Sequence, residues 1–278
     1  MNTVLGSTSA LLGTALIWLM AGTITEASSF AAGQAAFHRG DFVEAAGHWE
    51  EAARQSAQTQ DGAGQVEAWV RLATAQQALG RNRAAVTTLE QALAVAERLP
   101  DRRLLLLVKS NVGGVCSCIR QRTWAEKLLR EAAELATELK DDNAAALVWS
   151  SLGNSLALQG KRTEALAAYE KSAQLAQRPA LRVTALVNGA AVAGTAEWDR
   201  RARAAVPTLD RSHEQARLWL RCAETEIRLA NEPVAEASAR SALAIGEELA
   251  DPRLRSYACG LGLTRFFVHP VVVLMIFS

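Results

Sequence analysis

Two residues near the C-terminus have side chains that could cleave a peptide bond. Cys259 and His269 are the residue types of a Cys/His dyad, in which the imidazole takes the proton of the thiol and leaves a nucleophilic thiolate. No oxyanion-hole context surrounds them, and Cys259 occupies a position that a core hydrophobe usually fills. We therefore expect no catalysis by this pair.

A metal site is the second kind of chemistry to consider. His38 and His48 flank Asp41, but two histidines ten residues apart across a helical turn do not have the spacing of metal ligands. No glycine-rich phosphate loop follows a strand, because no segment alternates in the manner of a strand. The sequence predicts no metal, no cofactor, no small-molecule substrate and no enzyme.

The sequence predicts that all the elements that carry these residues are helices. Half of the residues are hydrophobic, and the six prolines stand mostly at apparent helix ends. Cys116 and Cys118 are two residues apart on a predicted helix, so their side chains point about 200° apart and cannot form a disulfide. Core thiols are the better interpretation of the cysteines.

The chain repeats itself at an interval of forty residues. A period in this range, carried by small and bulky apolar residues, is typical of a helical solenoid, in which each repeat packs only on its neighbours. The fold class that follows is all-α. The residues that recur are Leu72, Val112 and Leu152, then Ala85, Ala125 and Ala165, and then Leu89, Leu129 and Tyr169.

The clearest copy of the repeat begins at Trp149 and continues through Leu152 and Gly153. Its pattern resembles the tetratricopeptide repeat, which has W-x2-L-G-x2-Y and a later A-x3-F. The resemblance implies a right-handed superhelical solenoid of about six repeats over residues 28–258, with the period contracting in the last two. The residues that match across the copies are Trp69, Leu72, Gly80, Ala85, Gly113, Ala125, Trp149, Leu152, Gly153, Gly160, Ala165, Tyr169 and Trp219.

Packing between the two helices of a repeat explains these residue types. Gly153 and Ala165 are expected where the helices approach most closely, while Trp149, Leu152 and Tyr169 fill the space toward the next repeat. Glycines 40, 80 and 160 are expected to end first helices in a left-handed cap. Because the period exceeds the usual 34 residues, we expect longer helices or longer turns, such as 58–65 and 140–143.

Three phrases narrow the resemblance further. "Ala-Glu-Arg-Leu-Pro-Asp", "Leu-Gly-Asn-Ser-Leu-Ala-Leu-Gln-Gly" and "Leu-Ala-Asp-Pro-Arg-Leu-Arg-Ser-Tyr-Ala" look like the repeat array N-terminal to the caspase-like CHAT domain of bacterial proteins. The likeness covers residues 30–258. Nothing in the chain matches the CHAT protease domain itself, so proteolysis is not carried over.

The resemblance also implies a concave groove lined by the first helix of each repeat. Uncharged polar side chains there could bind an extended peptide or an amphipathic helix, or could only keep the face hydrated. The family's Lys/Asn clamp for C-terminal carboxylates is not reproduced, since Asn154 has the right type but Ser150 stands where Lys is needed. The predicted lining is Gln34, Phe37, His38, Thr74, Gln77, Ser110, Ser117, Ser150 and Asn154.

The two ends differ from the array. Residues 1–27 have the short apolar core of a signal peptide, and an uncleaved anchor over residues 4–24 is the alternative. We expect export to the periplasm or cell envelope, or attachment to the inner membrane by that anchor. Residues 259–278 form an atypical hydrophobic tail, which indicates either a truncated or frameshifted chain or an edge for self-association.

Charge excludes one class of partner. A formal net charge of +1 argues against nucleic-acid binding, which needs a basic stripe. The charge is uneven, with seven acids against two arginines over residues 26–67 and eight arginines against four acids over residues 178–221. The bland interpretation is solvated helix faces, and the other is a docking patch for an acidic partner.

The predicted function is a non-catalytic scaffold that binds protein or peptide partners. A truncated or regulatory half of a CHAT-type protease and a self-associating assembly module are the alternatives.

Overall fold

The computed structural model describes residues 29–118 and 121–262, which form helices joined by short connectors. No described residue lies in a β-strand, so the predicted all-α helical-repeat solenoid is confirmed. The chain separates into two compact units between Leu139 and Lys140. The predicted signal peptide or anchor and most of the predicted tail lie outside the described residues.

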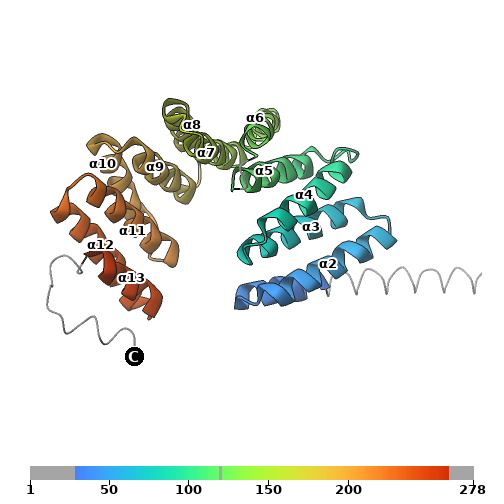
Figure 1. Ribbon diagram of the computed structural model, residues 1–278, viewed down its shortest axis with the longest axis horizontal. Coiled ribbons are helices and arrows are strands. Elements are labelled where there is room, and N and C mark those ends of the chain that lie inside the picture. The colour runs from blue at the N-terminus through green and yellow to red at the C-terminus, as the bar shows by residue number, and fades with distance from the viewer. Residues whose placement is uncertain (1–28, 119–120, 263–278) are drawn as a thin grey trace, which may run out of the picture. The chain divides into compact units, whose positions relative to one another are not determined.

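The first unit is built from antiparallel helix pairs. Each helix contacts the next along the chain, and α3 also contacts α5, which places the first helices of two neighbouring repeats side by side (Figure 1). A helix over residues 29–39 packs on α2 through a shared apolar cluster. The other helices are α2 (Phe42–Gln58), α3 (Gly62–Ala78), α4 (Asn82–Ala96), α5 (Arg102–Cys118) and α6 (Arg122–Glu138).

The second unit continues the same pattern with its own core. Its first helices α7, α9, α11 and α13 contact one another in succession, and its second helices alternate with them. The elements are α7 (Asp142–Leu158), α8 (Arg162–Leu175), α9 (Pro179–Ala193), α10 (Ala196–Ala205), the short 3-10 helix η1 (Val206–Thr208), α11 (His213–Arg228), α12 (Glu232–Glu248) and α13 (Pro252–Gly262).

The forty-residue period has a simple structural origin. From α2 to α8 a new helix begins every twenty residues, and most of these helices have 17 residues followed by a three-residue connector. The extra length therefore resides in the helices. The turns expected over 58–65 and 140–143 are only the connectors 59–61 and 139–141. The starting residues are Phe42, Gly62, Asn82, Arg102, Arg122, Asp142 and Arg162.

The period then contracts, as the sequence predicts. Pro179 and His213 begin successive first helices 34 residues apart, which is the usual tetratricopeptide spacing. The shortening falls on α9, with 15 residues, and on α10, with 10 residues. Proline 207 follows in η1, where the chain leaves the α-helix.

Left-handed residues end several first helices. Gly40, Gly80 and Gly160 have φ values of 83°, 73° and 77°. After α11 the same position is held by Ala230 at φ 54°, and its amide donates to Ile227 O while the next amide donates to Glu226 O. This double hydrogen bond is the Schellman closure of a helix, which a glycine satisfies with least strain.

Close approach of the two helices in a repeat depends on glycine. A Cβ atom at Gly153 would lie 2.7 Å from Cε1 of the Tyr169 ring, and one at Gly113 would lie 2.5 Å from Cγ of Leu129. Both glycines face a bulky residue sixteen positions later. Among the other predicted packing residues, Leu72, Ala85, Ala125, Leu152 and Ala165 are buried, and Trp69, Trp149 and Trp219 are half-buried.

Candidate functional site

Polar side chains of the first helices in the first unit are mostly satisfied by their own helix. Thr74 donates to the carbonyl of Val70 at 2.9 Å, and Ser110 donates to that of Leu107 at 2.8 Å. The half-buried Gln34 and the exposed His38 bond each other through their side chains at 2.7 Å, and Gln77 is half-buried. These residues offer a partner few unengaged groups.

Two of the predicted lining residues pack against their own repeat. Phe37 packs against the rings of Phe42 and Trp49, with centroids 5.1 and 5.5 Å away. Ser117 is buried, and its hydroxyl donates to the carbonyl of Gly113 at 2.9 Å. Ser117 is therefore not available to a partner, whereas Phe37 is half-buried against the aromatic cluster.

The second unit holds a different arrangement around Asn154, on α7. Asn154 is exposed, and Ser150, one turn earlier, is half-buried. On the neighbouring first helix α9, Asn188 precedes Gly189 as Leu152 precedes Gly153, so a polar amide stands where a repeat normally has a core leucine. Asn188 is only 6% exposed. A buried amide needs hydrogen-bond partners, since an unpaired one costs about 1–3 kcal/mol.

Those partners come from both neighbouring first helices. Arg221 of α11 donates from Nη1 to Oδ1 of Asn188, and Nδ2 of Asn188 donates to Oδ1 of Asn154 at 3.4 Å. Tyr169 of α8 donates its hydroxyl to that same Asn154 oxygen at 2.7 Å. We call Asn154, Asn188, Arg221 and Tyr169 the polar chain. It crosses three successive first helices and has exposed groups at both ends.

The environment keeps Tyr169 as a donor. Burial raises the pKa of its phenol to about 12, although the nearby Arg221 charge opposes this shift. The hydroxyl therefore holds its proton at neutral pH. Sequence reasoning selected Tyr169 for packing and Asn154 for the lining, but it missed Asn188 and Arg221. The signal for Asn188 was its place before Gly189, whereas no local signal marks Arg221.

Most arginines of the basic stretch 178–221 are engaged within the protein. Arg201 bonds both carboxylate oxygens of Glu170 on α8, at 3.0 and 2.9 Å. Arg203 pairs with Asp199 and Glu226, and Arg211 pairs with Glu248. The excess of positive charge is thus largely structural. Arg221 faces solvent, and its guanidinium makes one described hydrogen bond, to Asn188.

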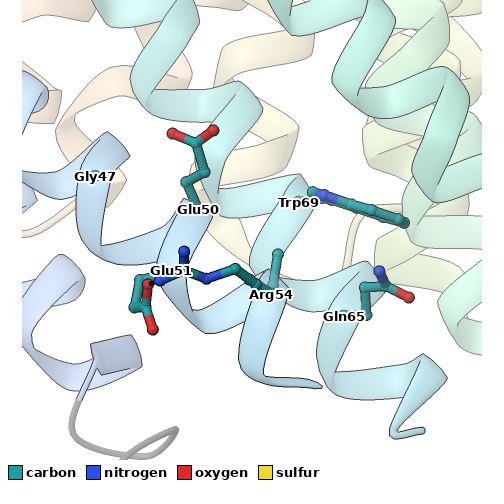
Figure 2. Close-up of a pocket in the computed structure, with 7 residues that line it drawn as sticks. Gly47, Glu50, Glu51, Arg54, Gln65 and Trp69 are labelled. Atoms are coloured by element: carbon teal, nitrogen blue, oxygen red, sulfur yellow. Dashed lines mark ion pairs between the residues drawn. The ribbon is translucent and has the colours of Figure 1, made fainter. Parts of the chain in front are cut away.

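A cavity of about 420 Å³ lies between α2 and α3 in the first unit (Figure 2). Glu50, Glu51 and Arg54 line it from α2, and Gln65 and Trp69 line it from α3. Figure 2 shows Arg54 turned toward Glu51, with which it forms an ion pair. No buried polar group is aimed into this cavity, so it is a weaker candidate than the polar chain.

The described residues contain no group of three or more His, Cys, Asp or Glu side chains that could hold a metal ion. Asp41 instead caps α2 by accepting from the amide of Glu44 at 3.1 Å, and His48 lies 3.6 Å from Glu44. Cys259 is a half-buried free thiol on α13, and His269 lies outside the described residues.

Within the described ranges, no helix is both long and apolar enough to cross a membrane. The candidate anchor at residues 4–24 is not among those residues.

Comparison with known families gives one match. Residues 68–103 match the tetratricopeptide repeat. The match spans most of α3, all of α4 and the start of α5. No curated protein matches the chain.

Solved structures with a similar fold cover most of this chain. A Rap protein complexed with Competence and Sporulation Factor superposes with a TM-score of 0.61 at 14% identity, covering 87% of this chain and 74% of that one. Aspartyl phosphate phosphatase F from Bacillus subtilis gives 0.62 at 10% identity, covering 89% and 72%. A STAND protein with a tetratricopeptide repeat sensor from Pyrococcus horikoshii gives 0.58 at 14%, covering 81% and 35%. At these identities the likeness shows the fold.

Proposed function

We propose that this chain is a non-catalytic scaffold that binds a protein or peptide partner on the first-helix face of its second unit. The observation that carries the proposal is the polar chain. Asn188 occupies a position where a repeat normally has leucine, and its amide hydrogen-bonds to both Asn154 on α7 and Arg221 on α11. Packing alone does not call for this arrangement, because an apolar residue would fill the same place without needing partners.

The exposed ends of the polar chain suit contact with a peptide. Asn154 and Arg221 are both exposed, and both are held by side-chain hydrogen bonds before a partner arrives. Such preorganisation lowers the entropy lost on binding. The Rap protein whose fold is similar was solved in a complex with Competence and Sporulation Factor, which supports a binding role for this architecture.

The test is partner capture with a double variant. The full chain is used as bait in an extract of the source cell, and bound proteins are identified by mass spectrometry. Asn154→Ala with Arg221→Ala should lose the specific partner while the melting temperature stays within a few degrees of wild type. The control is Gln174→Ala, at an exposed position on the second helix α8. Unchanged capture by the double variant would refute this site.

Localisation and the chain ends carry separate proposals. We infer export to the periplasm or cell envelope through residues 1–27, with a membrane anchor over 4–24 as the alternative; cell fractionation of the tagged chain tests both. Self-association through the tail predicts a concentration-dependent size that is lost on deleting residues 266–278. A regulatory half of a CHAT-type protease predicts an encoded CHAT domain downstream or on a separate chain that co-purifies.

A further inference from the structure

The direction of every hydrogen bond in the polar chain is determined at one end. A guanidinium has donors and no acceptor, so Arg221 can only be bonded by the oxygen of Asn188. That contact turns Nδ2 of Asn188 toward Asn154. Because Nδ2 is also a donor, the atom of Asn154 that faces it must be Oδ1.

The same oxygen of Asn154 is then saturated. It accepts from Asn188 at 3.4 Å and from the Tyr169 hydroxyl at 2.7 Å, which uses both of its lone pairs. Its Nδ2 group, which carries two N–H donors, has no partner among the residues that the structure describes. The exposed groups of the polar chain are therefore the amide N–H donors of Asn154 and the remaining N–H donors of Arg221.

We infer that Tyr169 and Arg221 hold the Asn154 amide in one orientation, so that the exposed groups of the polar chain are donors alone and select a partner through carboxylate oxygens. Tyr169 is thus a positioning residue for binding, although it comes from a second helix and lies beneath the face. This inference rests on the proposed function and adds the chemistry of the partner to it.

Charge favours a carboxylate over a neutral carbonyl as the acceptor. Arg221 and Arg217, one turn apart on α11, are both exposed. The nearest acid in the following turn, Glu224, accepts the Tyr257 hydroxyl at 2.8 Å. Hydrogen bonds between a guanidinium and a carboxylate are roughly twice as strong as neutral ones. An acidic peptide can form these stronger hydrogen bonds, and an amide-bearing peptide of the same length cannot.

Two hexapeptides with the same backbone separate these chemistries. Fluorescently labelled hexaglutamate and hexaglutamine are titrated with the full chain, and binding is followed by anisotropy. Wild type should bind hexaglutamate at least tenfold more tightly, equivalent to about 1.4 kcal/mol. Tyr169→Phe keeps the ring against Gly153 and every charge, yet should weaken hexaglutamate binding by about fivefold, because the amide of Asn154 loses one of its two fixed contacts.

Further variants test the cation and the folding. Arg221→Lys retains a donor-only cation and should keep the preference for hexaglutamate. Arg221→Gln removes the charge and offers an acceptor that can reverse the hydrogen bonds of the polar chain, so it should lose that preference. Gln174→Ala, at the exposed position on α8, lies outside the polar chain and should bind as wild type does. Circular dichroism melts check that each variant is folded.

The outcomes distinguish this inference from the proposed function. Equal binding of the two peptides, no binding of either, or wild-type binding by Tyr169→Phe would overturn the inference. If the Asn154→Ala/Arg221→Ala variant still lost the cellular partner in those cases, the proposed binding site would be supported. Only the inferred preference for carboxylates would be wrong. If the double variant still bound hexaglutamate and still captured the cellular partner, both the inference and the proposed function would be refuted.

Discussion

Glycine marks the points where the two helices of a repeat touch, and neighbouring glycines on α5 allow this to be measured. A Cβ atom at Gly113 would lie 2.5 Å from Leu129 Cγ and 3.2 Å from the carbonyl oxygen of Ala125. We expect Gly113→Ala to cost about 1–3 kcal/mol, because the helices must separate or Leu129 must leave its rotamer. The measurement is the midpoint of thermal unfolding by circular dichroism.

Gly114 is the matched control, since a Cβ atom there meets nothing within 4 Å. Gly114→Ala should stabilise the protein by about 0.5–1 kcal/mol through the gain in helix propensity. Equal effects of the two substitutions would show that the close contact at Gly113 does not restrict side-chain size.

A buried carboxyl group makes the stability of the second unit depend on pH. Glu226 on α11 is 0% exposed. Its Oε1 lies 3.0 Å from Nε of Arg203 on α10, and Asp199 shares that guanidinium at 3.3 Å. Burial raises the pKa of Glu226 to about 7; Asp199 also raises it, whereas Arg203 and a hydrogen bond from Ser238 on α12 lower it. Two carboxylates thus compete for one cation.

The sign of the effect follows from the raised pKa. The folded state holds the Glu226 proton up to about pH 7, while the unfolded chain releases it near 4.5. Stability is therefore fully present below about pH 4.5 and falls as pH rises to 7, by about 3 kcal/mol for this group. Glu226→Gln should remove that loss, so its melting temperature should exceed the wild-type value at pH 8 and approach it at pH 5.

The exposed Glu247 on α12 provides the comparison. Glu247→Gln should leave the pH profile of the melting temperature as it is in wild type. Parallel profiles for wild type and Glu226→Gln would contradict a raised pKa at Glu226.

Among the elements, the connectors between helices have fixed geometry but variable residues. Ala230 ends α11 at φ 54°, where α3 and α7 are followed by glycine. An L residue pays about 1 kcal/mol or more for this conformation. Ala230→Gly should relieve that strain and, after the greater entropy of glycine in the unfolded chain is counted, stabilise by about 0.5 kcal/mol.

The reverse substitution tests the same property. Gly160→Ala, at φ 77°, should destabilise by about 1 kcal/mol, although no atom lies within 4 Å of the added methyl group. If Gly160→Ala were neutral in chemical denaturation, backbone conformation would not explain the preference for glycine at these connectors.

Helices and their register could be predicted from the sequence because each repeat carries the same local signals. Leu152-Gly153 followed by Tyr169 identifies a helix pair without reference to other repeats. The polar chain could not be predicted in the same way. Asn188 and Arg221 are 33 residues apart and meet because α9 and α11 pack side by side as first helices of neighbouring repeats. Glu226 stands four residues after Cys222, just as Leu156 stands four residues after Leu152. This spacing could have predicted a charged residue at a core position.

For the molecule as a whole, the two units have different surfaces on their first helices. In the first unit, Thr74 and Ser110 bond the carbonyls of their own helix. In the second unit, Asn154 and Arg221 are exposed and oriented by contacts between helices. The proposed binding site for a partner is therefore in the second unit, over α7, α9 and α11.

Photo-crosslinking in the source cell tests that position most directly. A photoreactive amino acid is placed at Ser150, one turn from Asn154 on α7, or at the exposed Gln174 on the second helix α8. We expect a specific cross-linked partner from position 150 and none from 174, and the product should disappear when Asn154→Ala and Arg221→Ala are added. A product from position 174 alone would place the partner on the opposite helices and contradict this account.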